Sequence, residues 1–282
     1  MTIRILHHWA CSGGTIISRS IASLPKVLLL SEVHPLAHLR LTIEGPEYCP
    51  TDLIRQVCLN HNHRDPILCL AMWNGAIDSL QREAQSQGLS LVLRSHSHID
   101  FFTGPFTADT SFVSNSLAPR HRLLELFSVR HPLDSWISMT KMGWDKHFRF
   151  HSFSEFCRRG IAMTQSLVNV PVLRYEEFTL EPENSMKFIS NLLELCYDQD
   201  HLLKLESISL SGNSGRSGDD IGPRLRQTIP TNIQEELELI CDKDSSYIEL
   251  CHLLGYDSDP LAAHPFTLDT ITSTNIRFLT HS

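Results

Sequence analysis

The sequence predicts an α/β protein with a mainly parallel central sheet flanked by helices. Two observations favour this class. Short apolar runs of strand length alternate with longer segments in which apolar residues recur every three or four positions. The first of these runs also enters a helix through a glycine-containing turn, as at the start of a βαβ unit. We see no internal repeat and no clear linker, and we therefore expect a single domain spanning residues 1–282.

The composition is that of a globular protein with a moderate negative charge. Hydrophobic residues make up 41% of the chain and charged residues 20%, which is typical of a chain with a packed core. The net charge of −8 argues against general binding to nucleic acid or anionic membranes, but a local cluster of cations would still bind a small polyanion. No run of eighteen apolar residues and no secretory leader is present, and the eight cysteines include no CxxC pair. We expect reduced thiols, no integral membrane segment and a cytoplasmic protein.

The stretch from Ile3 to Ile21 predicts a strand, a tight turn and a helix. Apolar residues up to Trp9 precede the turn Ala10–Thr15, and a helical pattern follows it. Glycines in such a turn let the backbone approach an anion, and the N–H groups and dipole of a helix N-terminus attract negative charge. Ser12 and Thr15 add hydroxyl donors. Taken alone, the stretch fits a phosphate-binding turn and an ordinary strand-to-helix turn equally well.

Further strands and helices follow before residue 120. The continuous apolar run Lys26–Ser31 is typical of a strand buried on both faces, and Leu89–Leu93 predicts another strand. Helix starts are indicated at Thr51-Asp52, for a helix to about Leu59, and at Asp65-Pro66, for an amphipathic helix that Gly88 stops. Residues 101–120 predict a long surface loop, and this loop and residues 32–50 would line a binding pocket. Four phenylalanines would supply its apolar wall: Phe101, Phe102, Phe106 and Phe112.

The second half of the chain repeats this alternation. Leu123–Val129 and Val170–Leu173 are predicted strands. Three helix starts are indicated, at Pro132 with a stop at Gly143, at Ser152 or Ser154 with an end near Leu167, and at Glu181-Pro182. Residues 211–230 predict a glycine- and serine-rich loop, and Thr231 caps a last helix. That loop carries Arg216, Arg224 and Arg226.

Polar, cationic or glycine-rich residues stand where three of the predicted strands end. These are the glycine turn after the first strand, Arg94-Ser95-His96 after the third and Arg130 after the fourth. Ligands of open α/β sheets bind beyond the carboxyl ends of the strands, so we expect these segments to face one site. Arg130 offers a planar fork and Ser138 a hydroxyl, which together suit one phosphate group. The alternative is a surface arginine and an exposed helical serine.

Two HxH pairs raise the alternative of a metal site. They are His61/His63 and His96/His98, from a total of sixteen histidines. Alternate residues of a strand place both rings on one face. A closed site needs further ligands, and the chain supplies none at a suitable spacing. We therefore expect no metal.

Three segments together resemble the sulfotransferase family, whose members use 3′-phosphoadenosine 5′-phosphosulfate (PAPS). They are the glycine turn, the pattern Arg130-x-Pro-x-Asp-x-x-x-Ser138, and Arg174-Tyr175-Glu176-Glu177-Phe178 followed by Glu181-Pro182. The resemblance implies a P-loop NTPase-like sulfotransferase fold without a Walker A sequence. The Arg-Lys-Gly motif of the cytosolic small-molecule members is absent, which places the chain outside that subgroup.

The resemblance also implies roles for individual residues. The turn would hold the 5′-phosphate side of the cofactor through Cys11, Ser12, Gly13, Gly14, Thr15 and Ile16. The 3′-phosphate would be held by Arg130 and Ser138, with Arg216 as the first choice from the late loop and Arg224 or Arg226 as the second. Arg94-Ser95-His96 resembles the family's Lys-Thr-His segment, whose histidine is the catalytic base. The catalytic candidates are therefore His96, His98 and Arg94.

On this basis we expect sulfuryl transfer from PAPS to a hydroxyl or amine of a carbohydrate, lipid or small metabolite. A neutral histidine suits removal of the acceptor proton near neutral pH, and the sequence does not choose between His96 and His98. A P-loop nucleotide kinase is disfavoured because GxxxxGK[ST] is missing. The acceptor and the oligomeric state are not readable from the sequence.

One departure from the family bears on catalysis. Members commonly have Lys or Arg where this chain has Cys11, to stabilise the bridging oxygen of the leaving group. The missing positive charge would come from Arg19, Arg94, His7 or His8. Otherwise the protein would be catalytically weak, or a non-catalytic relic that binds nucleotides or other anions.

Overall fold

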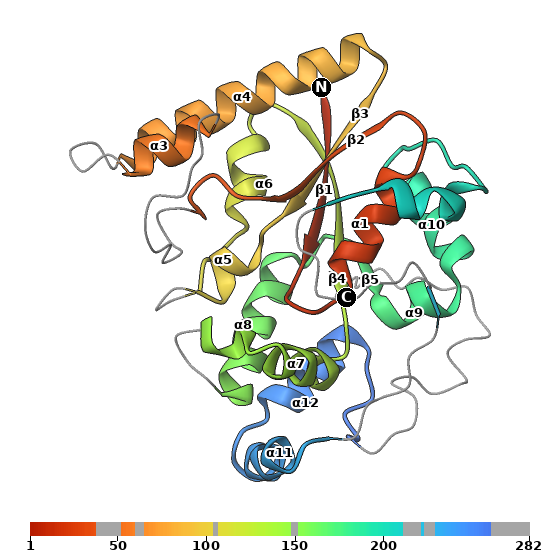
Figure 1. Cartoon of the computed structure of the whole chain (residues 1–282). Helices are drawn as coiled ribbons and strands as arrows, with labels where there is room; N and C mark the ends of the chain where they lie inside the picture. Colours follow the sequence, from red (N-terminus) through yellow and green to blue (C-terminus); the bar gives the residue numbers. More distant parts are fainter. Residues whose placement is uncertain are drawn as a thin grey trace.

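A five-stranded parallel sheet forms the centre of the structure. The structure is a computed structural model, and it describes residues 1–37, 52–59, 65–103, 107–147, 152–210, 221–222 and 229–260. The strand order is β2-β3-β1-β4-β5 (Figure 1). The strands are β1 (Thr2–His8), β2 (Val27–Val33), β3 (Ser90–Ser95), β4 (Arg122–Val129) and β5 (Val172–Arg174). Each neighbouring pair is parallel. The predicted α/β class is therefore confirmed.

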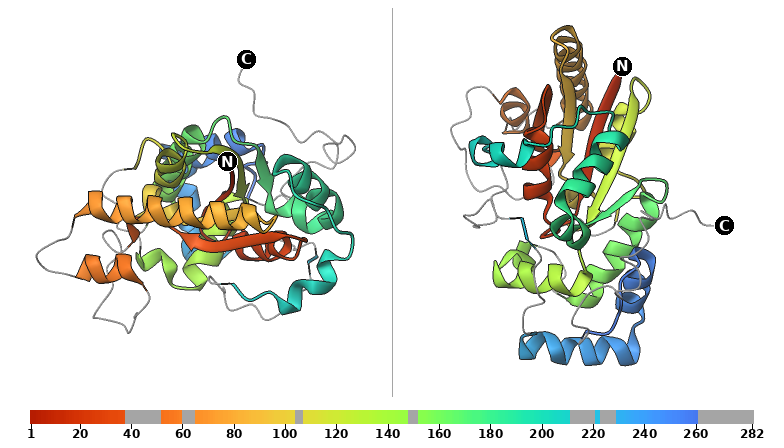
Figure 2. Two further views of the ribbon diagram at one scale, coloured as in Figure 1. Left: turned by 90° about the horizontal axis from the view of Figure 1, so that it is seen from above. Right: turned by 90° about the vertical axis from the view of Figure 1, so that its right-hand side faces the viewer.

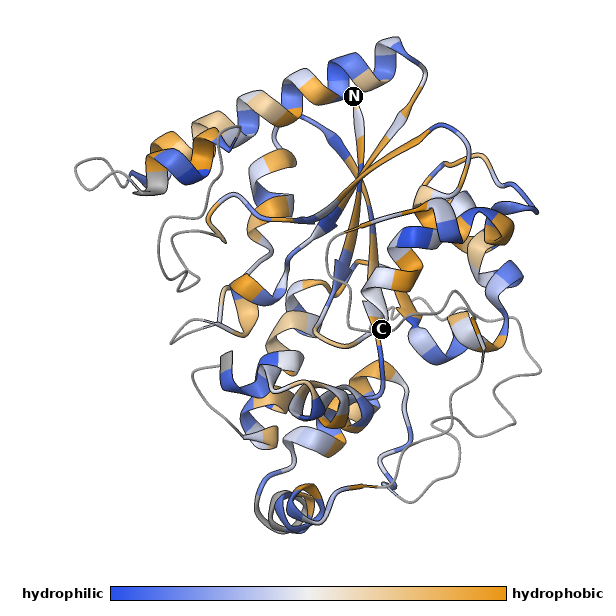
Figure 3. Cartoon of the chain, viewed as in Figure 1, coloured by the Kyte–Doolittle hydropathy of each residue, from blue (hydrophilic) through white to orange (hydrophobic). Residues whose placement is uncertain are grey.

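Helices cover both faces of this sheet. On one face lie α1 (Gly14–Ala22), α9 (Tyr175–Leu180) and α10 (Pro182–Leu192), which pack on the strands through residues such as Ile17 and Met186. On the other face lie α4 (Pro66–Ser86) and α6 (Phe112–Leu117), and α3 (Leu53–Leu59) packs beside α4. Apolar residues run along the central strands (Figure 3), as expected for strands covered on both faces. Shorter elements are α5 (His98–Phe101) and the 3₁₀ turns Trp144–His147 and His201–Ser207.

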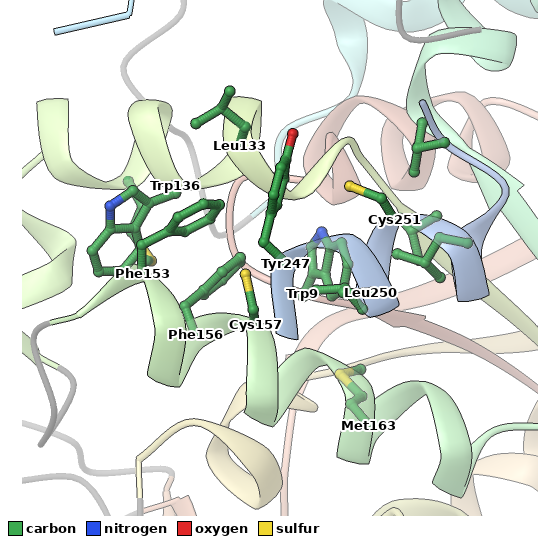
Figure 4. Packing of buried hydrophobic residues seen from close by; sticks show 14 of the residues in the cluster. Trp9, Leu133, Trp136, Phe153, Phe156, Cys157, Met163, Tyr247, Leu250 and Cys251 are labelled. Carbon is green, nitrogen blue, oxygen red and sulfur yellow. The ribbon is translucent and has the colours of Figure 1, made fainter. Parts of the chain in front are cut away.

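A third group of helices lies beyond the carboxyl end of β1 (Figures 1 and 2). It comprises α7 (Pro132–Lys141), α8 (Phe153–Ser166), α11 (Thr231–Lys243) and α12 (Ser246–Leu254). Trp9, which follows β1 directly, is fully buried among them, with its ring 5.9 Å from that of Phe156 (Figure 4). A Cβ on Gly160 of α8 would lie 2.8 Å from Leu250 Cδ2, so α8 and α12 pack too closely there for a larger residue. Trp9 thus anchors the turn after β1 in this core.

Most elements predicted from the sequence are present. All five strands lie at the predicted positions within a few residues. The side chain of Asp65 accepts a hydrogen bond from Ile67 N–H at 2.8 Å, and that of Ser152 accepts one from Glu155 N–H at 3.2 Å. Gly88 and Gly143 adopt left-handed φ values of 67° and 70° just after α4 and α7. These starts and stops depend on local hydrogen bonds and backbone conformation, which sequence patterns report directly.

Three expectations were wrong. Residues 101–120 are not a surface loop throughout, because they contain α6, and both Phe101 and Phe102 are buried in the core rather than lining a wall. The strand predicted to be buried on both faces, β2, is an edge strand whose residues are all half-buried. His96 and His98 do not share an extended segment, because α5 begins at His98.

Within the described ranges, no helix is long and apolar enough to span a bilayer.

Candidate functional site

The turn between β1 and α1 is built around two glycines that each accommodate an aromatic ring. Gly13 adopts a left-handed φ of 79°, and a Cβ there would lie 2.1 Å from Tyr175 Cδ2. A Cβ on Gly14 would lie 2.7 Å from His8 Cγ. Real Cβ atoms do not approach ring carbons this closely, so neither ring could keep its place beside a larger residue. The glycines therefore serve the packing of Tyr175 and His8 as well as the approach of a ligand.

The N-terminus of α1 offers positive potential to a ligand. Gly13 stands at its N-cap without a side-chain cap, and its first turn contains no acidic residue. The N–H groups of a first helical turn and the helix dipole favour an anion at such a position. The hydroxyl of Ser12 is turned inward, where it is fully buried and donates to Trp9 O at 2.9 Å. A ligand would therefore meet this residue's backbone rather than its side chain.

Arg130 brings a guanidinium from the end of β4 to the same turn. Its Nη1 donates to Cys11 O at 3.3 Å, across a separation of 119 residues in the sequence. Its Cζ lies 5.3 Å from the centre of the Tyr175 ring, within the range of a cation–π interaction. Tyr175 thus touches Gly13 on one side and supports Arg130 on the other. Ser138 is half-buried in α7, the helix that follows Arg130.

Sequence reasoning did not place Glu176 in the site, yet its carboxylate lies close enough to Arg130 to feel that charge. Glu176 Oε1 accepts a hydrogen bond from the backbone N–H of His131 at 2.9 Å, and Oε2 accepts one from the Tyr256 hydroxyl at 2.7 Å. Burial raises the pKa of Glu176, and the charge of Arg130 is among the influences that oppose this rise. Glu176 therefore links the start of α7 to the segment after α12. In the sequence, only its position in the Tyr-Glu-Glu motif pointed to a role for Glu176.

Arg94 lies against the other side of the turn, at the end of β3. Its side chain is buried, with Nε donating to His8 Nε2 at 3.0 Å and Nη1 to Ser31 Oγ at 3.2 Å. Its Nη2 lies 3.3 Å from Glu32 Oε1, and the same atom would be 3.2 Å from a Cβ on Gly14. Burial lowers the pKa of Arg94, and the charge of Glu32 opposes this effect. The guanidinium is therefore next to the first residue of α1.

Glu32 reaches Arg94 from an irregular point of β2. It adopts a left-handed φ of 55°, and the pairing of β2 with β3 shifts register between Leu30 and Val33. A left-handed φ is unfavourable for a residue with a Cβ. Glu32 adopts it at the point where its carboxylate pairs with Arg94. The sequence predicted that residues 32–50, which include Glu32 and His34, would line a binding pocket. The structure instead places His34 in a buried pair with Asp100, at 3.0 Å.

Both ring nitrogens of three nearby histidines have partners within the protein. His7 lies 3.3 Å from Ser97 Oγ and 2.9 Å from Glu125 Oε1. His8 lies 3.1 Å from Trp9 O through Nδ1 and accepts from Arg94 through Nε2. His34 Nδ1 accepts from Leu36 N–H at 3.1 Å while Nε2 contacts Asp100. These three rings are structural members of the sheet's carboxyl end.

His96 and His98 lie next to each other beyond β3, with ring centres 3.6 Å apart. Burial lowers the pKa of His96 to about 4, with further lowering by His34 and Arg94. Burial also holds the pKa of His98 well below its usual range, as do the charges of His96 and Arg94. Among the described residues, Nδ1 of His98 is buried and has no hydrogen-bond partner. Both rings are therefore neutral near pH 7.

Several predicted residues lie elsewhere or outside the description. Thr15 and Ile16 are half-buried in the first turn of α1. Arg19 points away from the turn, because its side chain donates to the backbone carbonyls of Leu205 and Ile208. In the described part of the chain, no three metal-ligating side chains cluster. Outside the described residues lie His61, His63, Phe106, Arg216, Arg224 and Arg226.

Two solved structures are similar to this arrangement over most of their length. The sulfotransferase domain from the Synechococcus PCC 7002 olefin synthase matches with a TM-score of 0.53, covering 91% of this chain and 95% of that one at 17% identity. The chain has the sulfotransferase fold. A sulfotransferase domain from the curacin biosynthetic pathway matches with the same TM-score of 0.53, over 86% of this chain and 98% of that one at 13% identity. No protein-family model and no curated protein sequence matches. The shared sulfotransferase fold therefore rests on architecture rather than on sequence identity.

Proposed function

We propose that the chain is an enzyme that transfers a sulfuryl group from PAPS to a hydroxyl or amine of a carbohydrate, lipid or small metabolite. The observation that carries the proposal is the contact between Arg130 Nη1 and Cys11 O, at 3.3 Å. It puts an arginine beside the N-terminus of α1, at the carboxyl end of a parallel sheet, in a chain with the sulfotransferase fold. Two anionic groups of one nucleotide would be bound there together.

The residues around the turn fit such a cofactor. The backbone N–H groups of Gly13, Gly14 and Thr15 would hold the 5′-phosphate, since α1 begins with neither a side-chain cap nor an acid. Arg130 and Ser138 would hold the 3′-phosphate. When bound, PAPS would supply the sulfuryl group and leave as PAP, with the electron pair of the broken sulfur–oxygen bond on its 5′-phosphate. Positive charge on both sides of the turn suits that outcome.

His96 is the proposed base that removes the proton from the acceptor. Its pKa of about 4 leaves the ring neutral near pH 7 and able to accept a proton. A neighbouring anion would favour the protonated ring and raise this pKa, because opposite charges stabilise the charged form. Protonation of His96 would therefore be more favourable with an anion bound beside it. His98, 3.6 Å away between ring centres, is the second candidate.

A non-catalytic anion-binding protein is the second candidate function. The observation that favours it is Cys11, whose backbone carbonyl accepts a hydrogen bond from Arg130 and whose side chain carries no positive charge. A protein of this kind would bind PAP without promoting transfer. The two candidates therefore differ in turnover and agree on binding.

The test combines calorimetric titration with PAP and a transfer assay with PAPS over a panel of hydroxyl and amine acceptors. We expect PAP to bind without added metal, and at least one acceptor to be sulfated. His96→Ala should nearly abolish turnover and leave PAP affinity within about threefold, since the base acts on the acceptor. Normal turnover in that variant would move the role to His98 or elsewhere. PAP binding without any turnover would favour the non-catalytic candidate, and no binding would overturn both.

A further inference from the structure

The turn after β1 lacks a cation at Cys11, and we infer that Arg94 supplies the missing positive charge from the neighbouring strand. The inference rests on the proposed function, because the charge is needed where the leaving phosphate would lie. It assigns to Arg94 direct contact with the anion held at the N-terminus of α1. The loop position and the end of β3 would thus be alternative places for one charge.

Arg130 is assigned to the 3′-phosphate, and elimination among the other nearby cations leads to Arg94. Arg19 donates to Ile208 O at 3.0 Å and is directed toward the 3₁₀ turn at residues 201–207. His7 faces the opposite side of the sheet, in contact with Glu125 at 2.9 Å. His8 touches Gly14, but burial and the charge of Arg94 hold its pKa well below the usual range, so it is uncharged. The Nη2 atom of Arg94 lies beside Gly14, 3.2 Å from where a Cβ would stand.

The surroundings of Arg94 fix its guanidinium before any ligand arrives. His8 Nε2 accepts a hydrogen bond from Arg94 Nε, and His8 Nδ1 faces the carbonyl of Trp9 at 3.1 Å. This pattern requires the neutral tautomer with the proton on Nδ1, since a protonated ring accepts nothing. Ser31 holds a second edge of the guanidinium at 3.2 Å. A side chain held at several atoms in this way loses little freedom on binding.

Glu32 is the resting counter-ion in this arrangement. Its carboxylate lies 3.3 Å from Arg94 Nη2 and keeps 23% of its side-chain surface exposed. A buried guanidinium without a partner would be costly, and Glu32 provides that partner. Because Glu32 is partly exposed, water would hydrate its carboxylate when another anion takes its place beside Arg94. Glu32→Gln should therefore raise PAP affinity, by about three- to tenfold on the scale of a partly exposed ion pair.

The decisive experiment is a double-mutant cycle between positions 11 and 94, read by calorimetric titration with PAP. Arg94→Gln should weaken binding about 10- to 100-fold, as expected for the loss of a charge-assisted contact. Adding Cys11→Lys to Arg94→Gln should recover at least about tenfold, while Cys11→Lys alone should gain less than about threefold, because one anion needs one such cation. Arg94→Lys should retain more affinity than Arg94→Gln.

Arg4→Gln is the matched control. Arg4 is a second buried arginine on the sheet, but it donates to Leu193 O at 2.6 Å, near the N-terminal end of β1. Its loss should lower the thermal midpoint and leave PAP affinity unchanged. If Arg94→Gln does not fold, Arg94→Met with and without Cys11→Lys gives the same comparison, because methionine also removes the charge.

The results distinguish failure of the proposed function from failure of the assignment of Arg94. If PAP does not bind the unmodified protein, the proposed function fails. If PAP binds it and Arg94→Gln binds equally well, or if Cys11→Lys gives the same gain in both backgrounds, the assignment of Arg94 is overturned and the proposed function stands.

Discussion

The two arginines that flank the turn after β1 are held in different ways. Arg94 is buried and ion-paired with Glu32, and its Nε is bonded to His8. Arg130 is half-buried, stacks 5.3 Å from the Tyr175 ring centre and donates to a backbone carbonyl. Arg94 is therefore positioned by an ion pair, and Arg130 by an aromatic ring and a backbone carbonyl. This difference suits Arg94 to the inner phosphate and Arg130 to the outer one.

Each glycine of the turn accommodates the ring that supports one of these arginines. Gly14 makes room for His8, which accepts from Arg94, and Gly13 makes room for Tyr175, on which Arg130 stacks. The sequence suggested glycines that admit a phosphate to the backbone. In the structure, the glycines also make room for His8 and Tyr175, the two rings that support the arginines. One turn thereby sets the position of both charges.

The largest expected effect is that of Gly13→Ala. A left-handed Cβ costs about 1–2 kcal/mol, and overpacking against a ring adds about 1–3 kcal/mol. We expect the free energy of unfolding to fall by about 2–5 kcal/mol, measured by urea denaturation. Gly143→Ala is the matched control, since Gly143 has a φ of 70° and nothing within 4 Å of an added Cβ. Equal losses in the two variants would show that Tyr175 yields without cost.

The second prediction concerns the pH dependence of stability that His96 contributes on the Arg94 side of the turn. On the Arg94 side, the pKa of His96 falls from 6.5 to about 4 on folding, so the unfolded chain binds more protons between these values. Stability is therefore fully present above pH 6.5 and is lost as the pH falls toward 4, by up to about 3 kcal/mol for this ring. His96→Gln should lose correspondingly less than the unmodified protein in urea denaturation at pH 7 and pH 4.5. An identical loss in both would contradict the burial of the neutral ring.

The third prediction sharpens the division of phosphates between the arginines. Arg130→Met should weaken PAP binding about 10- to 100-fold, the range of a charged hydrogen bond, and change the affinity for adenosine 5′-phosphate by less than about threefold. Arg94→Gln should weaken both ligands, because both carry the 5′-phosphate. Calorimetric titration of each variant with each nucleotide measures this pattern. Equal loss of both ligands in Arg130→Met would place Arg130 on the 5′-phosphate instead.

Local features of the fold were predictable from the sequence, and the supports of the site were not. Helix starts such as Asp65-Pro66 depend on atoms two or three residues apart, and all five strands are short apolar runs. The α6 helix was missed because its sequence, FVSNSL, is a weak helix former held by burial of Val113 and Leu117. Propensity does not report such tertiary packing.

The contacts that complete the site join residues far apart in the chain. Tyr256 and Glu176 are 80 residues apart, and Arg94 and Ser31 are 63 apart. Arg94 and Ser31 meet because β3 and β2 are neighbours in the sheet, whereas Tyr256 reaches Glu176 of α9 from the segment after α12. A single sequence gives neither the strand order nor this packing. The ends of strands marked Arg94 and Arg130 as cations of the site. Only the structure shows which of the nearby histidines form hydrogen bonds within the protein.

The smallest expected effect concerns Glu176 and has the opposite sign to that of His96. Burial raises its pKa above 4.5, so the folded protein binds the extra proton and stability falls as the pH rises through the window that begins at 4.5. Arg130, His131 and Tyr256 face this carboxyl. Glu176→Gln should reduce this fall by less than about 1 kcal/mol in denaturation curves between pH 5 and 7, whereas the adjacent Glu177→Gln should not. A steeper fall in Glu176→Gln would reverse the assigned direction.

The most direct measurement of the central claim is a crystal structure of the protein with PAP bound. We predict one phosphate on the backbone N–H groups of Gly13 to Thr15 beside Arg94, and the second within hydrogen-bonding distance of the Arg130 guanidinium and Ser138 Oγ. A nucleotide with both phosphates on one arginine, or bound away from the glycine turn, would contradict the claim that this turn sets two cations for two phosphates.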